Sequence, residues 1–135
     1  MTTTASISST NEARIRTGYA AFQSGDLAAF NTLFTPDITW HVPGRNPLAG
    51  DKRGIEATLE YFGELMARTD GTFRLELREV LAHDTIATGI HHETARRGGR
   101  TLDTDIVIIF RLAGEQVAEA WVHYYDQGVV DAFFA

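Results

Sequence analysis

The sequence predicts an α+β domain in which a curved antiparallel sheet wraps over three helices near the N-terminus. Before residue 70, apolar residues recur at helical spacing in three segments, interrupted by one short alternating segment. After Gly71, four long alternating segments follow with tight turns between them, which is typical of an antiparallel meander. The expected order is therefore helix, helix, strand, helix and four strands.

The first helix is expected over residues 10–24. Ser9 and Glu12 have the spacing of an N-terminal capping box, and Gly25 marks the C-terminal end. Asp26 then caps a short second helix, which stops before the Thr-Pro-Asp turn. The apolar stripe of this second helix consists of Leu27, Phe30, Leu33 and Phe34.

Residues 38–42 alternate as a strand does, and a turn-rich stretch follows over residues 43–54. A third helix is expected from Ile55 to near Asp70, because its apolar residues lie three and four positions apart. The apolar residues after Gly128 are expected to pack back as a last helical turn or strand. The four later strands are expected at residues 72–82, 85–95, 100–112 and 116–127.

Size and composition indicate one globular domain. The chain has 135 residues, of which 44% are hydrophobic, and this length suits a single core. The absence of cysteine excludes disulfides, thiolate metal sites and a cysteine nucleophile. The net charge is −6 and the basic residues are scattered, apart from the arginines around Gly98 and Gly99. We therefore expect no nucleic-acid partner, and no apolar run suggests a membrane partner.

Residues 1–9 are expected to form a polar, disordered leader, which leaves residues 10–135 as a single domain. This N-terminal segment has neither the basic residues nor the apolar stretch of a secretory signal. The expected location is therefore cytoplasmic.

Ionisable residues alternate with apolar residues in two of the later strands. One face of residues 101–110 carries Asp103 and Asp105 beside aliphatic residues, and the next strand carries Trp121 and His123 on one face. Because ionisable groups among apolar residues are costly to desolvate, this pattern predicts that they face a pocket. His123 beside Asp105 would form a proton-transfer pair in which the carboxylate orients the imidazole. The alternative is a satisfied polar pair within the sheet.

Other polar residues have two interpretations each. His91 and His92 are adjacent, so only one can face inward, and we favour His91 as an acid or an oxyanion ligand. Asp103 is either a neutral carboxyl in an apolar site or a solvated residue near the start of its strand. His41 is expected at the surface. Aromatic residues are expected mainly as core and pocket wall. The expected substrate contacts are Trp40, Trp121, Tyr19, Phe22, Phe62, Tyr125 and Val42.

No metal and no cofactor are expected from the motifs. The five histidines lack the H-x-H, H-x-x-x-H and E-x-x-H spacings of metal sites. Gly98 and Gly99 form a hairpin turn before a strand, whereas a dinucleotide-binding glycine motif opens a helix. No G-x-S-x-G nucleophile elbow is present.

Several short motifs occur in a characteristic order along residues 12–135. They are Ser24-Gly25-Asp26, residues 35–40, Gly89-Ile90-His91, Gly99-Arg100, and residues 114–121 closing on Asp126. In this order and spacing, the chain resembles the nuclear transport factor 2-like superfamily, which includes ketosteroid isomerase, limonene epoxide hydrolase and the SnoaL-like polyketide cyclases. The resemblance implies a cone-shaped, curved sheet wrapped around three helices and enclosing a pocket.

The resemblance to ketosteroid isomerase places one of three catalytic positions on a matching residue. Asp103 lies where the isomerase has its protonated oxyanion-hole aspartate. The isomerase's general base falls at Val42, and its oxyanion tyrosine falls at Gly18, next to Tyr19. The resemblance therefore does not imply isomerisation by the same route.

The other two branches point to the later strands. Trp121, His123 and the residues up to Asp126 resemble the end of the last strand of limonene epoxide hydrolase, with histidine in place of the catalytic carboxylate. In the SnoaL-like branch, a histidine before a Gly-Arg pair and an aspartate on the next strand serve the cyclisation. His91 matches this histidine, and Asp105 or Asp103 matches the aspartate.

These observations predict a cofactor-free enzyme that performs acid/base chemistry on a small hydrophobic oxygenated molecule of polyketide or terpenoid type. The reactions in view are cyclisation, isomerisation, dehydration and epoxide opening, with His123 as base, Asp105 orienting it, and His91 and Asp103 assisting. The alternative is a non-catalytic small-molecule-binding or dimeric assembly module. A homodimer is expected in both cases, because an outward face of the sheet is apolar and needs covering. That face carries Leu102, Ile106, Ile108 and Phe110.

Overall fold

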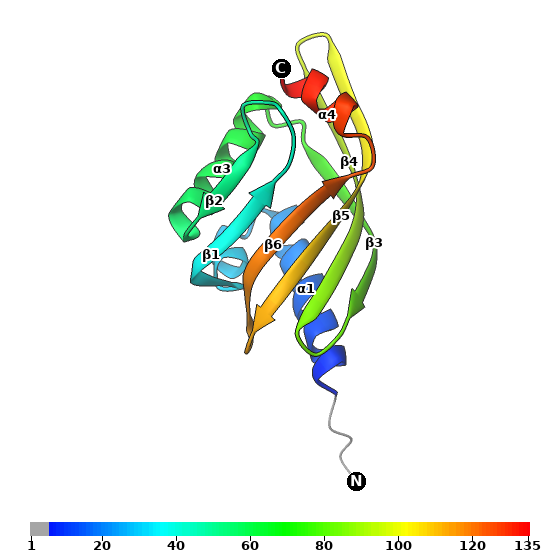
Figure 1. Ribbon diagram of the computed structural model, residues 1–135. Coiled ribbons are helices and arrows are strands. Elements are labelled where there is room, and N and C mark those ends of the chain that lie inside the picture. The colour runs from blue at the N-terminus through cyan, green and yellow to red at the C-terminus, as the bar shows by residue number, and fades with distance from the viewer. Residues whose placement is uncertain (1–5) are drawn as a thin grey trace.

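Among residues 6–135, six strands form one curled, unclosed sheet in the order β2-β1-β6-β5-β4-β3. The computed structural model describes residues 6–135. Helices and strands follow the predicted α+β order, with the sheet curved beside the helices (Figure 1). The strands are β1 Phe34–Val42, β2 Gly50–Arg53, β3 Arg74–Ala82, β4 Ile86–Arg97, β5 Arg100–Ala113 and β6 Gln116–Tyr124. The helices are α1 Ile7–Ser24, α2 Leu27–Asn31, α3 Ile55–Arg68 and α4 Gln127–Phe134.

The sheet is mixed. Strands β3 to β6 pair antiparallel in sequence order, which confirms the predicted meander. Strand β1 pairs in parallel with β6 and antiparallel with β2. The last strand therefore joins the N-terminal strands to the meander.

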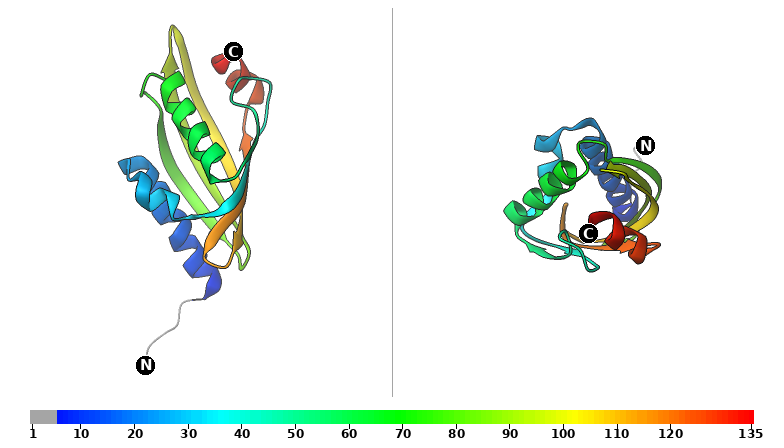
Figure 2. Two further views of the ribbon diagram at one scale, coloured as in Figure 1. Left: turned by 90° about the vertical axis from the view of Figure 1, so that its left-hand side faces the viewer. Right: turned by 90° about the horizontal axis from the view of Figure 1, so that it is seen from above.

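Two helices flank the interior. Helix α1 packs on β3 and β4, whereas α3 packs on β1 and β2. Viewed from above, the sheet curls around the space beside these two helices (Figure 2). The predicted C-terminal tail is helix α4, which begins at the cap Asp126 and contacts β5 and β6. Among residues 6–135, no helix is both long and apolar enough to cross a membrane.

The first helix begins earlier than predicted. Its N-cap is Ser6, whose hydroxyl accepts a hydrogen bond from the backbone N–H of Ser9. Ser9 is therefore inside the helix, because an equally good cap lies one turn before it. Residues 6–9 thus do not belong to a disordered leader, and residues 1–5 of the predicted leader lie outside the described part of the chain.

Strand β1 is longer than predicted and β2 was not expected. The second helix ends at Asn31, because the carbonyl of Leu33 accepts a hydrogen bond from Val117 N–H and Phe34 pairs with Val117 on β6. Sheet pairing thus replaces the last predicted helical turn. Strand β2 is short and polar, so it has none of the apolar alternation that marks a strand in a sequence.

The apolar face of β5 points into the core, not outward as predicted. The core residues on this face include Leu102, Ile106, Ile108 and Phe110, each at most 8% exposed. The opposite face carries Asp103 and Asp105, and burying five large apolar side chains is favoured over burying two carboxylates. The apolar face on which the homodimer prediction was based is therefore buried within the protomer and is not available for a partner.

Candidate functional site

An apolar pocket lies between the helices and the concave face of the sheet. Aromatic rings form most of its wall in edge-to-face contacts, such as Phe62 with Phe22 and with Trp40, at centroid distances of 5.6 and 5.1 Å. The internal cavity measures about 60 Å³. Such a volume holds a few water molecules, and it is smaller than the roughly 150 Å³ that accommodate benzene. A larger ligand therefore requires half-buried rings such as Phe22 and Phe62 to move apart.

Tyr19, His91 and Glu93 form a hydrogen-bonded chain in the wall of this pocket. Tyr19 Oη lies 2.9 Å from His91 Nδ1, and His91 Nε2 lies 2.9 Å from Glu93 Oε1. His91 and Glu93 face inward together because they are two positions apart on β4. These residues are 7%, 1% and 8% exposed, so the chain is a buried polar feature in an apolar environment. We call it the Tyr-His-Glu chain.

The end of this chain that is free to act on a ligand is Glu93. Both ring nitrogens of His91 are already occupied, one by Tyr19 and one by Glu93. The second carboxyl oxygen of Glu93 has no hydrogen-bond partner among residues 6–135, and its side chain keeps 10% of its surface exposed. Glu93 is therefore suited to exchange a proton with a ligand, whereas His91 is suited to hold the carboxyl in position.

Burial changes the acid/base properties of the pocket. Desolvation raises the pKa of Glu93, and the hydrogen bond with His91 opposes this rise only in part. Burial also raises the pKa of Tyr19 and Tyr61, and the nearby charge of Glu93 raises both further. Burial and the neighbouring Tyr61 raise the pKa of Tyr124, and the two tyrosines share a hydrogen bond. These phenols therefore remain protonated donors near neutral pH.

Comparison with known proteins identifies the family. The SnoaL-like domain matches residues 15–120. This chain belongs to the SnoaL-like family. An NTF2-like protein of Burkholderia pseudomallei shares its fold, at 18% identity and a TM-score of 0.83 over 93% of this chain and 98% of that one, as the sequence motifs indicated.

Relatives of this SnoaL-like chain cover almost its whole length. An uncharacterized protein of Mycobacterium tuberculosis H37Rv is 33% identical over 122 residues, which is 90% of this chain and 93% of the relative. Bal32a, from a soil-derived mobile gene cassette, is 39% identical with a TM-score of 0.93, over 96% of this chain and 100% of that one. TerC, co-crystallised with polyporic acid, shows the same fold at 19% identity and a TM-score of 0.81, over 93% and 98%.

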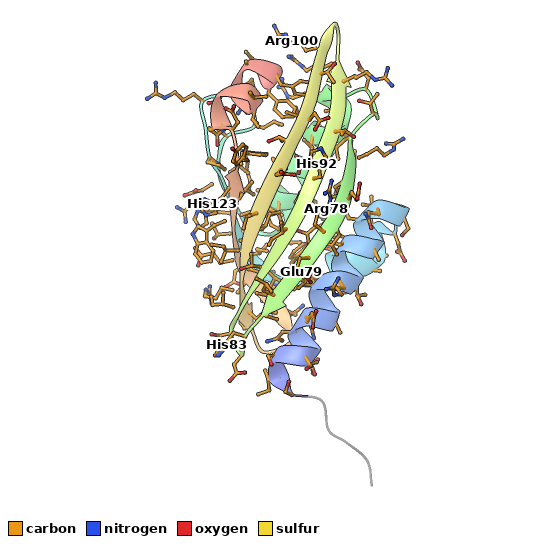
Figure 3. All side chains as sticks on the ribbon, turned by 90° about the vertical axis from the view of Figure 1, so that its right-hand side faces the viewer. Arg78, Glu79, His83, His92, Arg100 and His123 are labelled. Atoms are coloured by element: carbon orange, nitrogen blue, oxygen red, sulfur yellow. The ribbon has the colours of Figure 1, made fainter. Side chains whose placement is uncertain are left out.

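The SnoaL-like fold places His123, Asp105 and Asp103 on the outer face of the sheet, so the prediction that they face the pocket is wrong. His123 is exposed, and the aspartate side chains are 65% and 70% exposed. Figure 3 shows this outer face, with His92 and His123 labelled on it. His123 lies opposite Val107 on β5. The two aspartates instead bind His92, the neighbour of His91.

Two histidine–carboxylate clusters lie on the outer face. His92 bridges Asp105 and Asp103 at 2.6 Å each, and the hydrogen bond to Asp105 is the main cause that raises the pKa of His92. His41 bridges Asp51 and Glu119 in the same way, at 2.7 and 2.6 Å. The hydrogen bond to Glu119 is the main cause of the raised pKa of His41. These clusters satisfy polar groups within the sheet surface, but the partner of Asp105 is His92 and not His123, as the alternative interpretation had it.

The predicted substrate contacts divide between the two faces. Those that line the pocket are Tyr19, Phe22, Trp40 and Phe62. Trp121 stacks on His41 on the outer face, at a centroid distance of 5.5 Å, because strand alternation places it opposite to Ala120 and Val122. Tyr125 is 88% exposed beyond the end of β6. Val42 is buried in the core and does not line the pocket.

Three polar residues of the pocket were not predicted from the sequence: Glu93, Tyr61 and Tyr124. Glu93 has the same strand parity as His91, so the choice of His91 as inward already implied it. Tyr61 and Tyr124 lack a polar pattern that distinguishes them from core aromatics. Among the described residues, no group of three or more histidines, aspartates and glutamates is arranged to hold a metal ion.

The raised pKa of Glu93 makes folding stability depend on pH. The folded chain keeps this proton to a higher pH than the unfolded chain, whose glutamate has a pKa near 4.5. The stabilisation is therefore complete below 4.5 and is lost as pH rises through the folded pKa. Because glutamine cannot ionise, the melting temperature of Glu93→Gln is expected to increase relative to the parent as pH rises toward neutrality. Thermal denaturation of both proteins across this range measures the difference, and an equal offset at every pH would contradict it.

Proposed function

We propose that this SnoaL-like chain is an enzyme that catalyses cofactor-free proton transfer on a small hydrophobic oxygenated molecule. The observation that carries this proposal is the buried Tyr-His-Glu chain in the wall of an otherwise apolar pocket. Perturbed ionisable groups in a pocket are typical of acid/base sites. The reactions that suit the site are isomerisation, cyclisation, dehydration and epoxide opening.

Glu93 is the proposed acid/base. In its ionised form, its free oxygen removes a proton from a substrate carbon next to a carbonyl group, and the electron pair moves onto the carbonyl oxygen. The protonated carboxyl then returns the proton to another substrate atom. In its neutral form, favoured by the raised pKa, Glu93 protonates a carbonyl or epoxide oxygen first. A positioned acid/base contributes about 10²–10⁴-fold in rate.

The other polar residues support this chemistry from the same wall. His91 is a positioning residue, since its Nδ1 is hydrogen-bonded to Tyr19 and its Nε2 is hydrogen-bonded to Glu93. Tyr61 and Tyr124 lie near Glu93 and remain protonated, so their hydroxyls are suited to stabilise an oxyanion. The co-crystallisation of TerC with polyporic acid supports an organic ligand for this fold.

A panel of small hydrophobic ketones, enones and epoxides in deuterated water tests the proposal. The parent protein is expected to exchange carbon-bound hydrogen or convert at least one compound, as followed by NMR. Tyr19→Phe releases one side of His91 and is expected to lower the rate about fivefold, the value of a hydrogen bond of about 1 kcal/mol. His123→Gln is expected to leave the rate unchanged. A rate that falls with His123→Gln but not with Tyr19→Phe would contradict the assignment of the site to the concave face.

A second candidate is a non-catalytic binding module. Its cavity of about 60 Å³ admits only a very small ligand as it stands, whereas a ring-containing substrate requires movement of Phe22 or Phe62. The same panel separates the two functions. Binding without exchange or conversion of any compound would support the binding module over the enzyme.

A further inference from the structure

The indole N–H of Trp40 is a buried donor without an acceptor. Trp40 is 4% exposed, and its Nε1 has no hydrogen-bond partner among residues 6–135. The other buried side-chain atom of this kind is Thr35 Oγ1, on a residue that does not line the pocket. An unpaired buried donor is unfavourable, so native structures rarely keep one without a use.

The aromatic rings around Trp40 supply no acceptor, because they are hydrocarbons. Its ring contacts Phe34, Phe62 and Phe110 at centroid distances of 5.8, 5.1 and 6.1 Å. All of these residues line the pocket. An acceptor for the indole N–H can therefore come from a molecule that occupies the pocket.

Trp40 lies on β1, whereas His91 and Glu93 lie on β4, with β6 and β5 between them. Trp40 pairs with Ala120, and the same cross-strand row continues through Phe110 to Ala87 on β4. His91 lies four residues beyond Ala87, an offset of about 13 Å along β4 at roughly 3.3 Å per residue. A molecule that contacts both Trp40 and Glu93 thus presents polar atoms at two separate positions.

We propose that Trp40 is a second polar anchor for the pocket ligand, and that the ligand carries an acceptor oxygen, such as a carbonyl, at a position separate from the one that meets Glu93. The first anchor, Glu93, rests on the proposed function. The contact at Trp40 determines specificity, because an analogue without this oxygen leaves the indole N–H unpaired in the complex. Glu93 and its partners act on the other position of the ligand.

The indole signals of the two tryptophans provide a direct test. The protein labelled with ¹⁵N in tryptophan has one indole N–H signal from Trp40 and one from Trp121, and Trp121→Phe assigns them. The probes are 6-hydroxy-1-tetralone and its analogue without the ketone, 5,6,7,8-tetrahydro-2-naphthol. The ketone is expected to move the Trp40 proton signal downfield, whereas the analogue binds without this shift. Trp121 lies on the outer face, so its signal is expected to stay in place.

Affinity measurements on Trp40→Phe complete the test. Loss of one hydrogen bond is expected to weaken ketone binding about threefold to tenfold and to leave binding of the analogue unchanged. Equal shifts of the Trp40 signal with both probes, no shift with the ketone, or no binding of either probe would overturn the proposal. The Trp40 signal in Glu93→Gln separates this inference from the proposed function. The ketone is expected to shift the Trp40 signal in Glu93→Gln as it does in the parent protein. Loss of turnover in this variant tests only the role of Glu93.

Discussion

Glu93→Gln is expected to lower the rate of the proposed reaction about 10²–10⁴-fold and to leave the fold intact. Glutamine keeps the shape of the side chain and can still hydrogen-bond to His91 Nε2, but it cannot accept or release the catalytic proton. The loss is expected in turnover number more than in substrate affinity, because the proton moves only in the transition state. Initial rates across substrate concentrations measure it for any compound that the panel identifies.

A matched control for this substitution is available on the outer face. Glu119 is also a glutamate hydrogen-bonded to a histidine, His41, at 2.6 Å. Glu119→Gln makes the same chemical change outside the pocket and is expected to retain full activity. Full activity in Glu93→Gln, or equal losses in the two variants, would show that Glu93 is not the acid/base.

Gly89→Ala is expected to destabilise the protein by about 1–3 kcal/mol and to lower activity together with stability. Gly89 lies on β4 beneath the ring of Tyr19, and an added Cβ would stand 2.7 Å from Tyr19 Cε2 and 2.8 Å from Cζ. The rigid ring has to shift to relieve these contacts, which are too short for carbon atoms. The shift moves Tyr19 Oη away from His91 Nδ1 and breaks the first link of the Tyr-His-Glu chain.

Urea denaturation and the exchange rate on the same panel compound measure both effects. Gly99→Ala is the control, because nothing lies within 4 Å of its added Cβ. It is expected to change neither quantity appreciably. A Gly89→Ala protein as stable and active as Gly99→Ala would mean that Tyr19 does not need its close approach to β4.

The fold was predictable because local signals and the global pattern agree. Gly25 ends α1 with a positive φ of 76°, and Asp26 caps α2 directly after it. The turns of the meander are equally local, with Gly98 and Gly114 at positive φ. Strand β2 could not be predicted, since it owes its conformation to pairing with β1 and not to its own residues.

The candidate site was predictable only in part, because strand parity decides which side chains meet. Asp103 and Asp105 were predicted to face the pocket because they are ionisable residues beside apolar ones. The other face of the same strand carries more apolar area, so that face is buried instead. His91 was placed inward from its own parity, whereas its partner Glu93 was overlooked at the next inward position. The contact between Tyr19 and His91 joins residues 72 positions apart, and no local pattern encodes it.

The position of β6 between β1 and β5 affects how the molecule assembles during synthesis. Until β6 has left the ribosome, the nascent chain can form only two partial sheets, β1 with β2 and β3 to β5. Trp40 belongs to the first partial sheet and His91 belongs to the second. The growing polypeptide therefore has no complete ligand cavity before β6 inserts between β1 and β5. A ligand can bind only after this insertion.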